Sequence, residues 1–321
     1  MNANINFCSE FKKNQHNQQL IHIENSDVLL NCILSRFIYK NIIKTSFYNV
    51  YIKFMNAINI KLILLSLFFS VTFALASDKK PEPVTWEQNV IGLLYDDDVK
   101  IKDGSNLMVL ETPYRALDAA IVPISINFLK DQSPTDYIKH LTIVIDENPS
   151  PVVGKFEFSP KVGNASFSTR VRIDKYTYVR AIAENNKGEK YMVSNFVKAA
   201  GGCSAPSLAD MDSVMARLGK MKMKFIKTSD SSDKLNKARF LISHPNFSGL
   251  QFNQLTRSEI PAHFINFVRI EQDGNLIFEA SPDISLSEDP SFTFNYLNTG
   301  GSLIVKVNDS EGLSFSKEFS F

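Results

Sequence analysis

The feature that most constrains the fold is a succession of short apolar runs, each closed by a turn signal. Between residues 107 and 197, seven such runs are separated by clusters of Gly, Pro, Asn, Asp and Ser, which favour tight turns. Strands of this length and spacing are typical of an antiparallel β-sandwich of the immunoglobulin type. The runs cover residues 107–110, 120–128, 137–146, 152–158, 167–173, 176–183 and 190–197. Before them, Trp86–Tyr95 has apolar residues at helical spacing and predicts a short amphipathic helix.

A second group of short apolar runs occupies the C-terminal part of the chain. The six runs cover residues 238–243, 263–272, 276–280, 292–296, 303–307 and 313–321. Residues 272–275, Gln-Asp-Gly-Asn, predict a hairpin turn between two of them. Residues 204–234 combine helical spacing with a polar Ser/Asp stretch, which indicates a linker. We therefore predict an all-β protein of two immunoglobulin-like antiparallel β-sandwiches, 86–203 and 235–321, joined by a short partly helical linker.

An export signal is predicted ahead of both sandwiches. Residues 55–76 combine a basic start, an uncharged apolar run at 62–76 and a small-x-small site that ends at Ala76. The 15-residue run is shorter than the roughly 20 residues that cross a bilayer, which favours cleavage after Ala76 over a membrane anchor. The mature chain is then expected in the periplasm without a membrane span. Residues 1–54 are interpreted as translated upstream sequence or as a leader lost with the signal, rather than as an extra domain.

The charge of the chain argues against nucleic acid as a partner. The whole chain has a formal net charge of +1, and its first 76 residues hold seven basic and three acidic side chains. The mature chain would keep 28 basic and 31 acidic side chains, a net charge of −3. A mildly acidic protein lacks the basic surface that neutralises phosphates.

Cysteine usage points to one functional thiol. Cys8 and Cys32 precede the predicted cleavage site, so Cys203 is the sole cysteine of the mature chain and has no partner for an internal disulfide. It follows Gly201 and Gly202, between a strand pattern and a helical pattern. Because two glycines free the backbone and remove side-chain bulk, we predict a presented, reactive thiol on a hinge formed by these glycines. The alternative is a structural or incidental cysteine.

The residues around this thiol resemble a known family. Gly-Gly-Cys-Ser-Ala-Pro at 201–206 closes the first sandwich, and the SoxY family ends in a Gly-Gly-Cys-Gly-Gly sulfur-carrier arm. The second sandwich is similar to the SoxZ family. The segments that resemble SoxY are 111–113, 119–124, 145–151, 168–172 and 179–181, and those that resemble SoxZ are 244–245, 248–249, 260–265, 273–274 and 308–312. Together they indicate a fused SoxYZ-like carrier of the kind associated with quinoprotein dehydrogenases.

The resemblance implies a carrier without a catalytic site, a cofactor or a metal of its own. The Cys203 thiolate would bond to a sulfur species, on which periplasmic redox enzymes of a sulfur or quinoprotein dehydrogenase pathway would act. A thiolate is already a good sulfur nucleophile. The chain departs from SoxY because its arm is internal and Ser204-Ala205-Pro206 replaces the trailing glycines. Since proline restricts the backbone, the arm is expected to turn mainly at Gly201 and Gly202.

Several other site types lack their minimum residues. No Cys-x-x-Cys, His-Glu-x-x-His, Gly-x-Ser-x-Gly or phosphate-binding glycine loop occurs. A blue-copper site needs a histidine shortly after its cysteine ligand, and no histidine follows Cys203 until His244. His140 and His263 are interpreted as packing or surface residues.

Two other functions stay open beside covalent sulfur carriage. One is a non-covalent accessory or docking partner of a periplasmic quinoprotein dehydrogenase, which would use the two sandwiches as its contact surface. The other is delivery of Cu(I), because thiol and thioether side chains are soft ligands and His244 could join them. The residues concerned are Cys203, Met211, Met215, Met221 and Met223.

Overall fold

The computed structural model describes residues 49–55, 80–205, 211–226, 234–254 and 256–320. The chain divides into two compact units, Met1–Lys79 and Lys80–Phe321. In the first unit residues 49–55 form a helix, whereas the predicted apolar signal run and its cleavage site lie outside the described residues. None of the described helices is long and apolar enough to cross a membrane.

All seven runs predicted in the first half of the second unit, residues 80–205, form strands. They are β2 (Met108–Glu111), β3 (Val122–Phe128), β4 (Ile138–Ile145), β5 (Val152–Phe158), β6 (Phe167–Val171), β7 (Thr177–Asn185) and β8 (Lys190–Val197). The predicted helix is present as η2 (Trp86–Val90) and α3 (Ile91–Leu94), and a single turn, η3 (Pro160–Val162), connects β5 and β6. The sequence does not predict β1 (Ile101–Asp103), because Ile-Lys-Asp shows no apolar alternation.

The six runs predicted in the second half, residues 211–320, also form strands. They are β10 (Leu235–Ile242), β13 (Ile265–Gln272), β14 (Asn275–Pro282), β15 (Ser291–Leu297), β16 (Leu303–Asp309) and β17 (Ser314–Phe319). Asp273 and Gly274 form the expected hairpin turn between β13 and β14, and both have the positive φ that such a turn requires. Two short strands, β11 (Phe252–Asn253) and β12 (Ser258–Glu259), pair separately.

The predicted linker contains both a helix and a strand. Its helical part is α4 (Met211–Ala216), as the spacing predicts. Its later part, β9 (Met221–Ile226), pairs with β10 and so belongs to the second sandwich. The physical reason is the sequence Met-Lys-Met-Lys-Phe-Ile, in which apolar and charged residues alternate and Met221 is buried. The predicted linker residues 206–210 and 227–233 lie outside the described part of the chain.

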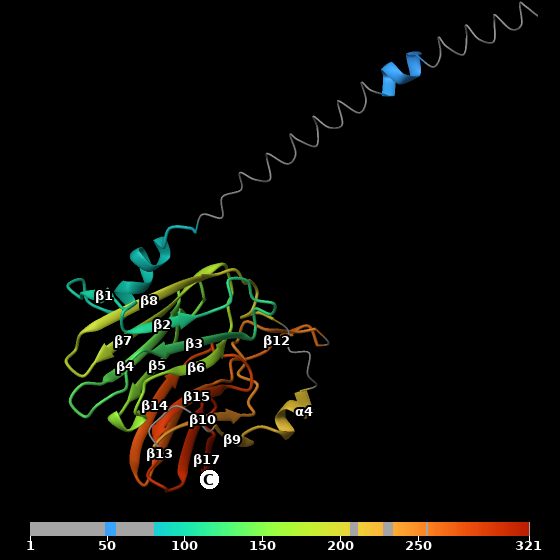
Figure 1. Ribbon diagram of the computed structural model, residues 1–321. Helices are drawn as coiled ribbons and strands as arrows, with labels where there is room; N and C mark the ends of the chain where they lie inside the picture. Colours follow the sequence, from blue (N-terminus) through green and yellow to red (C-terminus); the bar gives the residue numbers. More distant parts are fainter. Residues whose placement is uncertain (1–48, 56–79, 206–210, 227–233, 255, 321) are drawn as a thin grey trace, which may run out of the picture. The chain divides into compact units, whose positions relative to one another are not determined.

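The predicted all-β sandwich fold is confirmed, and the two sandwiches share their sheets. One sheet has nine strands in the order β1-β8-β7-β4-β5-β14-β13-β16-β17, and the other has six in the order β2-β3-β6-β15-β10-β9. In each sheet a strand of the first half pairs with one of the second, β5 with β14 and β6 with β15. Figure 1 shows this continuity from the green strands to the orange and red ones. The two halves therefore form one double layer.

Phenylalanine side chains fill the space between the sheets where the halves meet. The ring centroid of Phe167 lies 4.5 Å from that of Phe156 and 5.9 Å from those of Phe278 and Phe292. All four side chains are buried. Aromatic pairs at these separations stabilise a core beyond the effect of area burial alone. Because two of the rings come from each half, the hydrophobic core is common to both.

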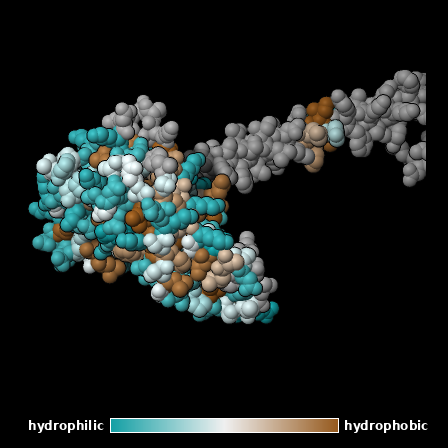
Figure 2. All heavy atoms as spheres, turned by 90° about the horizontal axis from the view of Figure 1, so that it is seen from below, coloured by the Kyte–Doolittle hydropathy of each residue, from teal (hydrophilic) through white to brown (hydrophobic). Residues whose placement is uncertain are grey.

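The surface carries separate apolar side chains among polar ones, as Figure 2 shows for one face of the molecule. Five exposed large apolar side chains lie on two segments, 112–121 of the first half and 248–252 of the second. They are Tyr114, Leu117, Ile121, Leu250 and Phe252.

Replacing Phe167 with alanine is expected to destabilise both halves together. Removal of a buried Phe side chain and the cavity that it leaves cost about 3–5 kcal/mol in typical cores. We expect one cooperative unfolding transition at a lower denaturant concentration, measured by circular dichroism. Phe315→Ala, at a partly buried position on the outer strand β17, is the control and should cost less. Two separate transitions, of which only one is shifted, would show that the halves unfold independently.

Candidate functional site

Cys203 lies in the loop that follows β8, residues 198–205, here called the cysteine loop. The backbone N–H of Gly201 donates to the carbonyl of Asp174, and that of Gly202 donates to the carbonyl of Ile173, each at 2.8 Å. These two bonds fix the loop to the chain that follows β6. The Cys203 side chain is 0% exposed.

The second half of the molecule also holds the cysteine loop. The Ser248 hydroxyl donates to the Cys203 carbonyl at 2.6 Å, and the Gln251 side-chain amide donates to the Ala205 carbonyl at 2.9 Å. Ser248 and Gln251 are both buried. The loop is therefore bonded to both halves.

The two glycines before Cys203 have different roles in this arrangement. A Cβ atom on Gly202 would lie 2.0 Å from the carbonyl oxygen of Ala119, so any other residue would displace the loop. Gly201 has a φ of 80° and open space around it, which makes it a turn position that favours glycine. The sequence predicts freedom at both positions, whereas the structure shows close packing at Gly202. The hinge itself stays a prediction.

Burial makes the Cys203 thiol a poor nucleophile in this structure. Burial, and then the negative charge of Asp174, raise the pKa of Cys203 to about 12, although the Arg172 guanidinium acts in the opposite direction. Only the thiolate is nucleophilic, so at neutral pH this thiol is protonated and unreactive. The expectation of a presented, reactive thiol therefore differs from the structure, in which the loop is closed over it.

Arg172 is a buried cation beside this thiol. Its side chain is only 2% exposed. Its Nε donates to the carbonyl of Leu286 at 3.2 Å, and its Nη2 donates to the carbonyl of Asn246 at 3.1 Å. These acceptors are neutral, and among the ion pairs of the described residues none includes Arg172. Arg172 lies in segment 168–172, which resembles SoxY in sequence, but the sequence does not predict that its side chain is buried.

The charge of Arg172 is only weakly compensated. Burial lowers the pKa of Arg172, whereas the charges of Glu288, of a Cys203 thiolate and of Asp118 raise it. An arginine stays protonated in proteins. A buried charge without a close counter-charge costs free energy. The charge of Arg172 therefore favours an anion at Cys203, although burial and the charge of Asp174 outweigh it for a thiolate in the closed loop.

Asn148 positions the segment that carries Arg172. Its side-chain amide donates to the Arg172 carbonyl at 2.8 Å and to the Ser285 hydroxyl at 2.9 Å. Its side-chain oxygen accepts from the N–H of Asp174 at 2.9 Å. A single buried side chain of the first half thus connects the end of β6 to the second half.

Two histidines and a carboxylate meet next to segment 244–248. Asp309 Oδ2 lies 2.9 Å from Nε2 of His263 and 3.5 Å from Nε2 of His244, and within the described residues these three groups are close enough to hold a metal ion. However, Nδ1 of His244 accepts the N–H of Asn246 at 3.0 Å, so the proton of the neutral ring lies on Nε2. Because a metal needs a lone pair there, the geometry fits instead a His-Asp-His group in which His263 is hydrogen-bonded to Asp309 and the buried Nε2 of His244 has no hydrogen-bond partner among the described residues.

This His-Asp-His group adjoins the segment that holds the cysteine loop, because His244 lies in that segment and accepts the N–H of Asn246. Burial, and then the charge of His263, lower the pKa of His244 to about 4, against the opposing effect of Asp309. Asp309 Oδ1 also accepts the N–H groups of Glu311 and Leu313 at 3.0 and 2.8 Å. His263 is therefore a packed residue, as the sequence suggests.

The remaining sequence candidates are spread over the molecule. His140, on β4, is partly exposed and lies 3.7 Å from Glu184. The four methionines divide between α4 and β9, where Met215 is exposed and Met221 is buried in the core. This arrangement gives the Cu(I) interpretation no support.

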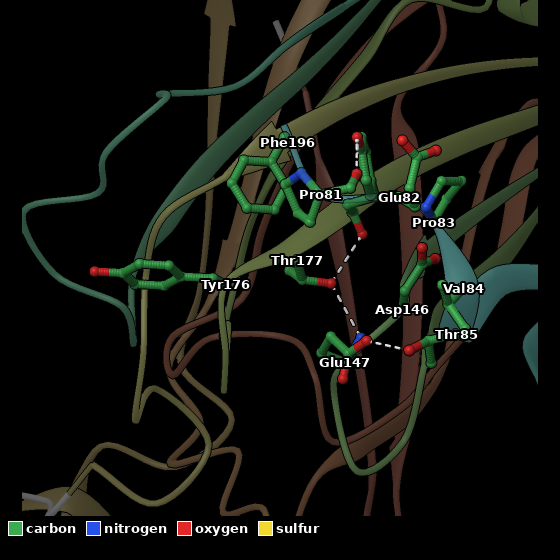
Figure 3. Close-up of a pocket in the computed structure, with 11 residues that line it drawn as sticks. Pro81, Glu82, Pro83, Val84, Thr85, Asp146, Glu147, Tyr176, Thr177 and Phe196 are labelled. Carbon is green, nitrogen blue, oxygen red and sulfur yellow. Dashed lines mark hydrogen bonds between the residues drawn. The ribbon is translucent and has the colours of Figure 1, made fainter. Parts of the chain in front are cut away.

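A pocket beside β7 and β8 does not include Cys203 (Figure 3). Its lining is residues 81–85, Asp146, Glu147, 176–178 and Phe196. The Thr85 hydroxyl donates to the Glu147 carboxylate, and the Tyr178 hydroxyl donates to the Pro81 carbonyl at 2.8 Å. These polar groups of the pocket are bonded to one another.

Two sequence families match the chain on either side of α4. The family described as Sulfur oxidation protein SoxY matches residues 94–203, so its match ends at Cys203. The family described as Sulphur oxidation protein SoxZ matches residues 223–320. The protein is thus one of the carriers of sulfur oxidation. The chain belongs to the fused SoxYZ-like carriers, with a SoxY and a SoxZ domain in one polypeptide.

The solved structures that match this chain share little sequence with it. The sulfur carrier protein SoxY from Chlorobium limicola f thiosulfatophilum has 19% identity and a TM-score of 0.30, and the alignment covers 36% of this chain and 94% of that one. A putative superoxide reductase from Thermotoga maritima has 18% identity and a TM-score of 0.26, with 31% and 92% covered. A superoxide reductase from Ignicoccus hospitalis has 13% identity and a TM-score of 0.26, with 29% and 79% covered. No curated protein sequence matches the chain.

The free energy of unfolding is expected to fall as the pH rises above 9. The folded chain keeps Cys203 protonated up to about pH 12, whereas the unfolded thiol ionises at its usual pKa of 9.0. The unfolded state then binds fewer protons, so stability decreases with pH. We would measure the free energy of unfolding by denaturant from pH 8 to 10.5 for the native chain and for Cys203→Ser. The free energy of the native chain minus that of the variant should fall by about 1.4 kcal/mol per pH unit above pH 9. A constant difference would show that the thiol is exposed in solution.

A second loss of stability is expected as the pH falls from about 6.5 to about 4. His244 stays neutral in the folded chain down to a pKa of about 4, whereas its usual pKa is 6.5, so the unfolded state takes up the proton first. The loss should be on the order of 3 kcal/mol, measured by denaturant unfolding. His244→Gln should remove this pH dependence, and His140→Gln, at a partly exposed position, should keep it. An unchanged pH dependence in His244→Gln would contradict the prediction.

Proposed function

We propose that this protein is an exported carrier that holds a sulfur species covalently on Cys203 and passes it to redox enzymes. The observation that carries the proposal is the position of this thiol, at the end of the SoxY match and beside a buried arginine. Residues 55–76 would direct export to the periplasm and be removed after Ala76. Cys203 would then be the sole cysteine of the mature chain.

Loading of the carrier requires the cysteine loop to open. In the closed loop the thiol is buried and protonated, so the nucleophilic thiolate forms only after the loop leaves its position. The contacts to be broken include two backbone bonds to residues 173–174 and the side-chain bonds from Ser248 and Gln251. Each hydrogen bond contributes about 1 kcal/mol net, which the binding of a partner enzyme can offset. Gly201, with open space around it, would act as the hinge.

The loading step forms a sulfur–sulfur bond between Cys203 Sγ and a reduced sulfur anion. The thiol proton goes to water, and the two electrons go to a redox enzyme that acts as the electron acceptor. Partner enzymes then oxidise the bound sulfur, and hydrolysis of the sulfur–sulfur bond by one water returns the thiol and releases a sulfur oxyanion. We propose a quinoprotein dehydrogenase pathway as the setting, in line with the sequence resemblance.

Partner enzymes would bind the surface on either side of the cysteine loop. Segment 112–121 contacts the loop through the Ala119 carbonyl at Gly202, and segment 248–252 contacts it through Ser248. Both segments expose the large apolar side chains described above. An enzyme bound there would contact the two segments that keep the loop closed.

Protein purified from its host under conditions in which the pathway is active should carry adducts on Cys203. Their masses should correspond to added sulfur atoms, with or without oxygen, and a reductant should remove them, as measured by intact and peptide mass spectrometry. Cys203→Ser should carry no adduct and should lose pathway activity, whereas the neighbouring variant Ser204→Ala should keep both. An unmodified Cys203 together with full activity of Cys203→Ser would reject covalent carriage and favour the non-covalent docking partner.

A further inference from the structure

Arg172 and Cys203 are held by the same two segments of the chain. The carbonyl of Ile173, the residue after Arg172, accepts the N–H of Gly202, the residue before Cys203. Segment 244–248 contacts both, because one of its carbonyls accepts Nη2 of Arg172 and its serine hydroxyl donates to the Cys203 carbonyl. The guanidinium and the thiol therefore share one buried region, and each shifts the pKa of the other.

A second buried arginine in the same sandwich is compensated in a different way. Arg180 donates through Nε and Nη2 to the Asp146 carboxylate, at 2.8 and 2.7 Å, and both side chains are buried. The ring of Trp86 lies 4.5 Å from this guanidinium. This fold therefore can pair a buried guanidinium with a carboxylate, and at Arg180 it does so.

At Arg172 the partners are backbone carbonyls instead of a carboxylate. Glu288 and Asp118 act on this guanidinium through space, but Glu288 is half-buried and Asp118 is exposed, so solvent and salt weaken their effect. A buried cation that keeps its hydrogen bonds but lacks an adjacent anion attracts negative charge into its surroundings. The thiol of Cys203 is the nearby group to which an anion can be attached. The half-buried Asp174 opposes a negative charge at Sγ itself, whereas a thiosulfonate group carries its charge on its outer oxygens.

We propose that Arg172 makes the Cys203 site selective for sulfur conjugates that carry negative charge, and that it stabilises the closed loop when such an anion is attached. The proposal rests on the proposed function in that Cys203 is the point of attachment. Arg172 is thus a specificity-determining residue, and a neutral disulfide-linked group at the same sulfur gains nothing from it.

The test compares two conjugates of the full chain in which Cys8→Ser and Cys32→Ser leave Cys203 as the single thiol. Attack of the thiolate on tetrathionate attaches an anionic thiosulfonate group and releases thiosulfate. Attack on methyl methanethiosulfonate attaches a neutral methylthio group and releases methanesulfinate. Intact mass confirms each product, and the midpoint of thermal unfolding is the readout.

The anionic conjugate should unfold at least about 3 °C above the neutral one. This difference should disappear in Arg172→Gln and be partly kept in Arg172→Lys, which retains the charge. Arg170→Gln, two residues earlier on β6, is the matched control, because Arg170 donates to the Asp289 carbonyl, and it should keep the full difference.

In the chain that keeps Arg172, equal unfolding midpoints of the two conjugates, or a higher midpoint of the neutral one, would overturn the proposal. This outcome can be read even if Arg172→Gln does not fold. A full difference in a folded Arg172→Gln variant would also overturn it. Because both conjugates are made in vitro, these outcomes are separate from the search for adducts in the host. A missing host adduct would reject the proposed function and leave the selectivity of Arg172 measurable.

Discussion

The closed site depends on the hydrogen bonds of the buried Arg172 guanidinium. The residue follows β6 in the first half, whereas the carbonyls that accept its hydrogen bonds belong to the second half. Burying a charge is costly unless its hydrogen bonds are made, so Arg172 is satisfied only when the two halves are docked. The same docking brings Ser248 to the carbonyl of Cys203. The state of the thiol is therefore coupled to the packing of both domains.

The continuity of the two sheets makes that docking rigid. Pairing of β5 with β14 and of β6 with β15 joins the domains through backbone hydrogen bonds, and the rings around Phe167 join them through the core. Such a junction differs from two domains on a flexible linker, which would move relative to each other. Exposure of Cys203 would then require movement of the cysteine loop rather than of the domains.

Local patterns in the sequence predict the elements well but the burial poorly. All thirteen strands that we predict from alternating and apolar runs are present in the structure, because strand formation depends on neighbours in the sequence. The closure over Cys203 depends on Ala119 and Ser248, and Ser248 lies 45 residues further along the chain. Gly202 illustrates the difference, because a glycine that permits close packing and one that permits motion look alike in sequence.

A closed loop is compatible with a carrier function, because the thiol is unreactive in the closed loop and the proposed reaction takes place with the loop open. The proposed export would place a lone thiol in an oxidising compartment, where a thiolate is exposed to cross-linking and over-oxidation. Burial that raises the pKa of Cys203 to about 12 suppresses the thiolate while the loop is closed. In the proposed cycle, opening would return the sulfur to water and to an ordinary pKa, so the nucleophile would appear where a partner enzyme has displaced the loop. Contact with the partner would then control reactivity, and the carrier would need no catalytic base next to its cysteine.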